Sequence, residues 1–188
     1  MPKLIAVSKQ QPDEKILNAL KYGQRIFGEN KLQDAIKRWT NLLKIYKGIE
    51  LHYIGHLQTN KVNKCLRLFD TIDSVDTLKL AEKINSSPQP QKTECLIEIN
   101  TSGESQKKGF KPKLSKELIS CFSLENLGIV GLMTIGPYTT SEKEIRGAFQ
   151  MLRVFKDQIN QELGENKLTE LSMGMSNDFE LGLSLIHI

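Results

Sequence analysis

Apolar and polar positions follow two different periods along this chain. Short apolar runs rich in β-branched residues recur, and the segments between them place apolar residues at helical spacing, as in Ile16, Leu17 and Leu20. The runs predict strands at Leu4–Ser8, Arg25–Gly28, Leu51–Gly55, Thr71–Val75, Glu94–Asn100, Gly128–Ile135 and Leu168–Met173. Before the last run, the helical spacing is carried by Phe149, Leu152, Val154, Phe155 and Ile159. Strands that alternate with helices predict βα units and a parallel sheet.

Polar residues and a proline mark where several helices are expected to begin. Helix starts are predicted at Pro12 with Asp13 and Glu14, at Thr77 with Asp76 as its cap, and at Ser141 with Glu142 and Glu144. Seven strand–helix units suit either an open doubly wound sheet or a nearly complete (β/α)8 barrel, and periodicity does not separate the two. A dinucleotide-binding sheet needs a glycine-rich turn after its first strand, whereas Ser8–Pro12 contains no glycine.

Polar residues close most of the predicted strands. In a βα barrel the carboxyl ends of the strands open onto the active-site face, so these residues predict the rim of a pocket. The strand ends carry Ser8 and Lys9, Gly28–Asn30, Gly55 and His56, Ser74–Asp76, Asn100, Met133 and Thr134, and Ser172–Ser176.

Composition places the chain among soluble globular proteins with one domain over residues 1–188. Hydrophobic residues make up 39% and charged residues 26% of the sequence. The net charge of +4 comes from scattered residues, and the densest basic run, Gln106–Lys111, is interpreted as a solvated loop, so no nucleic-acid partner is expected. No apolar stretch approaches the roughly 20 residues of a membrane span, and no signal peptide opens the chain.

The cysteines and histidines argue for a cytoplasmic protein without a metal site. Cys65, Cys95 and Cys121 are widely spaced and form no Cys-x-x-Cys pair, which is typical of reduced thiols in the cytosol. His52 is expected within a strand and His187 near the end of the chain, so the histidines do not have the spacing of metal ligands.

Lys9 is the candidate for covalent chemistry. A lysine at the inward-facing end of a strand is poorly hydrated there, and poor hydration favours the neutral amine that attacks an aldehyde. The alternative is that Lys9 leaves the strand and extends its ammonium group into water. The residue alone does not decide between these two interpretations.

Three motifs occur in the order that one known family has them. They are Leu4–Lys9 (LIAVSK), Phe27–Asp34 (FGENKLQD) and His52–Lys61 (HYIGHLQTNK). Further matches are Ser74–Asp76, Ile99 and Asn100 with Lys108–Phe110, Gly131–Ile135, and Leu171–Asp178. Through these motifs the chain resembles the pyridoxal phosphate homeostasis protein family, also described as proline synthase co-transcribed proteins, over residues 4 to about 180.

The resemblance implies a (β/α)8 TIM-type barrel, shared with the N-terminal domain of alanine racemases, and pyridoxal 5′-phosphate as cofactor. It implies that Lys9 holds the cofactor as a covalent aldimine, the Schiff base of the family's lysine. Asn30 would hydrogen-bond the ring substituents, or would serve only as a turn residue. His56 would line the same rim, or would be structural.

The turn after the last predicted strand resembles the phosphate end of the family's site. Ser172, Gly174 and Ser176 are small, so backbone N–H groups and serine hydroxyls can approach an anion there. A helix N-cap at Ser176, with Asp178 in the first turn of the helix, is a compatible alternative.

The chain departs from the family at both ends. The family has a helix before the first strand, and after the serine-rich turn it has a helix and an eighth strand with an Arg-Ile-Gly-Thr-like segment. Residues 181–188 carry neither that arginine nor the glycine–threonine pair. We therefore expect an unpaired sheet edge beside the first strand, unless the apolar tail Leu183–Ile188 fills it, and weak cofactor binding.

The function that the resemblance implies is binding of pyridoxal phosphate and its buffering or delivery in vitamin B6 homeostasis, without dedicated catalysis. Apoenzymes that depend on pyridoxal phosphate would be the recipients. One alternative is an alanine-racemase-like enzyme, which needs a second acid–base residue from a separate C-terminal β domain. Another is a scaffold without cofactor, which the missing eighth strand favours.

Overall fold

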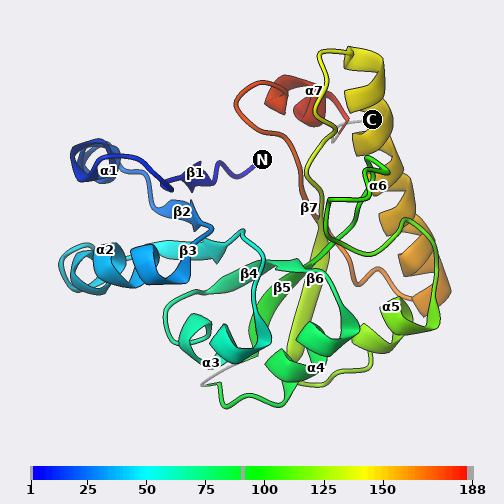
Figure 1. The fold of residues 1–188 in the computed structure, drawn as a ribbon, viewed down its shortest axis with the longest axis horizontal. Coiled ribbons are helices and arrows are strands. Elements are labelled where there is room, and N and C mark those ends of the chain that lie inside the picture. Colours follow the sequence, from blue (N-terminus) through cyan, green and yellow to red (C-terminus); the bar gives the residue numbers. More distant parts are fainter. Residues whose placement is uncertain (1, 90–91, 186–188) are drawn as a thin grey trace.

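The protein is described by a computed structural model that covers residues 2–89 and 92–185. One sheet holds seven parallel strands in chain order (Figure 1). The strands are β1 (Ala6–Val7), β2 (Ile26–Glu29), β3 (Glu50–Tyr53), β4 (Thr71–Val75), β5 (Thr93–Glu98), β6 (Leu127–Met133) and β7 (Glu170–Ser172). A doubly wound sheet reverses its strand order at a switch point, whereas a barrel keeps it sequential. The order therefore confirms the barrel-type fold and all the predicted strands.

Helices follow the strands and cover the outer face of the curled sheet (Figure 1). They are α1 (Asp13–Lys21), α2 (Leu32–Ile45), the 3-10 turn η1 (Thr59–Lys61), α3 (Val62–Cys65), α4 (Leu78–Asn85), α5 (Lys116–Cys121), α6 (Glu142–Leu163) and α7 (Phe179–Ser184). In α6 the apolar positions Phe149, Leu152, Phe155 and Ile159 are buried as predicted. Val154 is the exception and faces solvent.

The helix starts agree in part with the prediction. Ser141 caps α6 and accepts a hydrogen bond from the Glu144 N–H group. The cap of α4 is Thr77, whose hydroxyl accepts from the Leu80 N–H group, so the prediction of an Asp76 cap is wrong. The Asp76 carboxylate binds a histidine instead, as described below.

The sheet is open between β1 and β7. In the described part of the chain β1 bonds only to β2, and no eighth strand pairs with it. Residues 181–185 do not fill this edge, because α7 packs on α6, where Leu185 lies against Ile145 and Phe149. Residues 186–188 of the predicted tail, His187 among them, lie outside the described residues.

The core lies between the sheet and the helices. Trp39 of α2 is fully buried and packs on Phe27 of β2, with ring centroids 4.8 Å apart. All five residues of β4 are buried, as expected for a parallel strand covered on both faces. No helix within residues 2–89 and 92–185 is long and apolar enough to cross a membrane.

Candidate functional site

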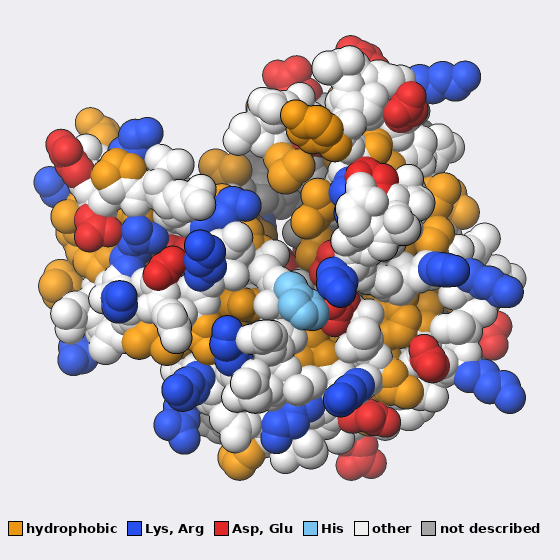
Figure 2. Space-filling model, in the orientation of Figure 1, with side chains coloured by type: hydrophobic (Ala, Val, Ile, Leu, Met, Phe, Trp, Pro, Cys, Tyr) orange, Lys and Arg blue, Asp and Glu red, His pale blue; other side chains and the backbone are white. Residues whose placement is uncertain are grey.

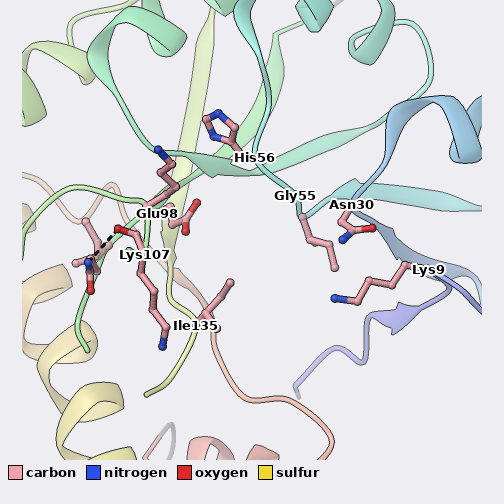
Figure 3. Close-up of a pocket in the computed structure, with 11 residues that line it drawn as sticks. Lys9, Asn30, Gly55, His56, Glu98, Lys107 and Ile135 are labelled. Carbon is pink, nitrogen blue, oxygen red and sulfur yellow. Dashed lines mark hydrogen bonds between the residues drawn. The ribbon is translucent and has the colours of Figure 1, made fainter. Parts of the chain in front are cut away.

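A cavity of about 280 Å³ opens at the carboxyl ends of the strands, on the face where barrels bind their ligands. Figure 2 shows the molecule hollowed between the part that holds β1 and β2 and the part that holds α6 and α7. The cavity is lined by Lys9, Asn30, Ile54, Gly55, His56, Glu98, Ile99, Asn100, Lys107, Lys108 and Ile135. Three predicted site residues, Lys9, Asn30 and His56, thus meet in one place (Figure 3).

Lys9 follows β1 and extends its amine into the cavity (Figure 3). The expectation of poor hydration is not met, since Lys9 is exposed. The reason is its place at the open edge of the sheet, where no described strand covers the far side of β1. The amine therefore faces the cavity and remains accessible to solvent.

Asn30 follows β2 and is held by close contact with β3. The Tyr53 hydroxyl donates to the Asn30 carbonyl oxygen at 3.3 Å. A side chain at Gly55 would clash with that oxygen, so only glycine allows the two strand ends to approach so closely.

His56 follows β3 and forms a hydrogen bond with the residue after β4. Its Nδ1 lies 2.8 Å from Asp76 Oδ2. The Asp76 side chain is buried, whereas 52% of the His56 side chain is exposed. The carboxylate fixes the orientation of the imidazole ring, whose other nitrogen is left to interact with a ligand or with water.

Glu98 is a site residue that the sequence interpretation missed. It ends β5, is 8% exposed and lines the cavity, and no described residue hydrogen-bonds its carboxyl group. Burial and the nearby Asp76 charge raise the pKa of Glu98 to about 7, although His56 and Lys108 oppose this shift. The available signal was a charged residue inside the apolar run Leu96–Ile99.

Two lysines on the loop after β5 also line the cavity. Lys107 Nζ donates to the Gly136 carbonyl oxygen at 2.6 Å and lies 2.7 Å from Glu104 Oε1, which fixes it at the rim. Lys108 is exposed and lines the cavity too. The interpretation of Gln106–Lys111 as a solvated loop missed this placement. Together with Lys9, these side chains give the cavity three cationic groups.

Ser172, Gly174 and Ser176 lie outside the lining of this cavity. Ser172 ends β7, so the turn stands at the same end of the sheet as Lys9. Gly174 has φ +93°, and a side chain there would lie 2.9 Å from the Phe179 Cα atom. The predicted cap at Ser176 is wrong, because the cap position of α7 is Asp178, whose carboxylate accepts from the Met175 N–H group.

The three cysteines and His52 fit structural roles. Cys65, Cys95 and Cys121 are buried free thiols, and burial raises the pKa of each. His52 lies within β3 as predicted, with its ring nitrogens 2.9 Å from Asp73 and 3.0 Å from Glu50. Among the residues that the structure describes, no three His, Cys, Asp or Glu side chains are grouped so that they could hold a metal ion.

Comparison with known proteins adds independent findings. Residues 1–187 match the family model of the alanine racemase N-terminal domain. The pyridoxal phosphate homeostasis protein of Bos taurus is 38% identical over 95% of this chain and 70% of its own length. The solved structure of PipY from Synechococcus elongatus PCC7942 without PLP has a TM-score of 0.87 at 34% identity and covers 97% of this chain and 86% of PipY. PipY with PLP bound has the same TM-score at 32% identity, over 98% of this chain and 88% of PipY.

Proposed function

Because the chain belongs to the alanine racemase N-terminal domain family, and within it to the pyridoxal phosphate homeostasis proteins, we propose that its cavity binds pyridoxal 5′-phosphate. Binding serves to buffer the cofactor and deliver it in vitamin B6 homeostasis. The observation that carries this proposal is the convergence of Lys9, Asn30 and His56 from successive strand ends on one cavity. PipY, which shares the fold and a third of the sequence, has been solved with the cofactor bound.

The side chains present fit the chemistry of this cofactor. Its aldehyde requires an amine, and Lys9 supplies one that is both in the cavity and open to solvent. We place the covalent link, a Schiff base, at Lys9. Solvent access suits a carrier, because water and other amines can reach the link and reverse it. A protein that only stored a reactive aldehyde would instead gain from a closed site.

The remaining lining residues would orient the ring. Asn30 offers an amide that can donate to or accept from a ring substituent. His56 is held by Asp76 and presents its second nitrogen. With a pKa of about 7, Glu98 exists near neutral pH as a mixture of carboxylic acid and carboxylate, so it can either donate or accept a hydrogen bond.

We propose that the phosphate lies at the turn formed by Ser172, Gly174 and Ser176. The turn is at the same end of the sheet as Lys9, and Gly174 keeps side-chain atoms away from an incoming anion. The Met175 N–H group is occupied by Asp178, whereas no described residue accepts from the N–H groups of Gly174 and Ser176 or from the hydroxyls of Ser172 and Ser176, so these would be the donors. Lys107 and Lys108 add positive charge to the approach path.

We further propose a cytoplasmic protein whose recipients are apoenzymes that use pyridoxal phosphate. The buried free thiols support a reducing compartment. One observation favours a second candidate function, alanine-racemase-like catalysis. Glu98 is a cavity carboxyl group with a pKa near neutrality, which suits a general acid or base, and it faces Lys9 across the cavity (Figure 3).

Titration of the purified protein with pyridoxal phosphate tests the proposal. We expect a visible absorbance band that saturates and that borohydride removes, with a mass increase of one reduced cofactor per chain. Absence of any band would leave only a scaffold function. An alanine racemization assay on the loaded protein decides between the two candidates, since turnover above that of free cofactor would favour the enzyme.

A further inference from the structure

A polar cluster outside the lining of the cavity lies next to the turn that carries Lys9. At its centre is Glu29, the last residue of β2, which is 1% exposed. Its Oε1 atom accepts hydrogen bonds from Arg38 Nη1 at 2.7 Å, from the Ser8 hydroxyl at 2.7 Å and from Trp39 Nε1 at 3.2 Å. A buried carboxylate with three donors is well compensated and fixes the side chains around it.

Arg38 connects this carboxylate to the backbone on both sides of Lys9. From α2 its Nη1 donates to the Ser8 carbonyl oxygen at 3.0 Å, and its Nη2 donates to the Gln11 carbonyl oxygen at 2.9 Å. Its Nε donates to Asp13 at the start of α1 at 2.9 Å. One planar guanidinium thus holds the residue before Lys9, the end of the turn and the next helix.

The turn needs such support because the sheet gives it little. β1 has two residues and, among the residues that the structure describes, pairs with β2 alone. Gln10 adopts φ +58°, a left-handed conformation that is unfavourable for a residue with a side chain. Within the turn, one backbone hydrogen bond joins the Gln11 N–H group to the Ser8 carbonyl oxygen at 3.2 Å. The position of Lys9 therefore depends on contacts from α2 and β2.

We propose that Glu29 and Arg38 are positioning residues that hold the Lys9 turn in the conformation that captures the aldehyde. This inference rests on the proposed function. Neither side chain lines the cavity, and the buried Glu29 carboxylate and the Arg38 guanidinium are bonded to each other and to the Lys9 turn, so neither is expected to contact the bound cofactor. Loss of the pair should slow covalent capture and leave non-covalent binding intact. A misplacement of about 1 Å can slow a reaction roughly a hundredfold.

The test separates capture from binding with two ligands. Pyridoxal phosphate reports the rate of borohydride-trapped attachment, and pyridoxine 5′-phosphate, which has no aldehyde, reports non-covalent affinity. The first variant is Arg38→Met, which leaves the buried Glu29 carboxylate without its cationic partner. The second is the double variant Glu29→Gln with Arg38→Met, which replaces that carboxylate by a neutral amide. Arg38→Lys keeps a positive charge, and Arg67→Lys, at an exposed position outside the cavity, is the matched control.

We expect capture about ten- to a hundredfold slower in both variants that lack Arg38, an intermediate rate in Arg38→Lys and no change in Arg67→Lys. The affinity for pyridoxine 5′-phosphate should stay within about twofold of the wild-type affinity, since the variants keep all the residues that line the cavity. Without any ligand, the Gln11 amide should exchange hydrogen faster in Arg38→Met. Unchanged capture, or equal losses of capture and affinity, would overturn the positioning role. A wild-type protein that traps no cofactor would instead overturn the proposed function and this inference with it.

Discussion

The two walls of the cavity differ in what holds their residues in place. Lys9 and Asn30 form one wall, and Glu98 and Lys107 stand on the other side (Figure 3). In the described part of the chain, Lys9 follows β1, the shortest strand of the sheet, which pairs with β2 alone, and Asn30 follows β2. On the other side, Glu98 is the last residue of β5, which pairs with both β4 and β6.

The two walls therefore contribute to the site in different ways. The Lys9 wall carries the reactive amine in an exposed position, and its geometry is set by side chains that lie outside the cavity. On the other wall, Glu98 ends a strand that is paired on both sides, and its carboxyl group is buried. Its contribution to the site is therefore electrostatic. Mutations beside Lys9 should therefore change the stability of the fold and the position of Lys9. Mutation of Glu98 should change how stability depends on pH.

The largest expected effect comes from the first wall. Trp39→Ala should lower the free energy of unfolding by about 3–5 kcal/mol, because it removes a fully buried aromatic ring that packs on Phe27. Trp39→Phe keeps most of the packing and removes the N–H donor to Glu29, so we expect a loss of only about 1–2 kcal/mol. Urea unfolding measures both, and equal losses would mean that packing is not what Trp39 contributes.

A smaller effect, confined to part of the pH range, is expected from the second wall. The folded pKa of Glu98, about 7, exceeds its ordinary value of 4.5, so the folded protein binds more protons than the unfolded chain between these values. Stability contributed by Glu98 is thus highest below about pH 4.5 and falls as the pH rises to about 7. The loss is on the order of 3 kcal/mol.

Glu98→Gln has no such proton to lose and isolates this contribution. We expect the variant to gain stability relative to wild type as the pH rises from 5 to 8. His52 also has a raised pKa, held up against burial by Asp73 and Glu50, and its contribution falls with rising pH in both proteins. Thermal melts across this range give the difference, and parallel curves for the two proteins would contradict the assignment.

The smallest effect concerns the turn after β7, which belongs to neither wall. Gly174→Ala should destabilise the protein by about 1–2 kcal/mol, because Gly174 has φ +93° and lies against Phe179. Gly147→Ala is the control with the opposite sign. It lies in α6 with nothing within 4 Å of an added Cβ atom, so alanine should stabilise by about 0.5–1 kcal/mol. Two changes of the same sign would show that backbone conformation does not govern these sites.

The sequence predicted the strands better inside the sheet than at its edges. β4 was found at Thr71–Val75 as predicted, and it is paired with β3 on one side and β5 on the other. At the open edge, Leu4–Ser8 shortened to Ala6–Val7, since a single neighbour supports it. The pattern of apolar residues indicates which positions are buried, but it does not indicate how many neighbouring strands a strand pairs with.

Lys9, Asn30 and His56 were predicted because each follows a predicted strand and lies in a motif that resembles the family, and all three line the cavity. Glu98 was hidden inside an apolar run, and the bonds from Arg38 to Ser8 and Glu29 join positions far apart in the sequence. Ser176 was misjudged as a cap because Asp178, two residues on, competes for the same role.

We place the covalent link to the cofactor at Lys9, and peptide mapping of the borohydride-reduced protein identifies the lysine that carries it. Lys61 and Lys108 are the matched controls, since both lie in motifs shared with the family. We predict the pyridoxyl mass on the peptide that contains Lys9, its disappearance in Lys9→Ala, and its persistence in Lys61→Ala and Lys108→Ala. An adduct found chiefly on Lys61 or Lys108, or one that survives in Lys9→Ala, would contradict the account.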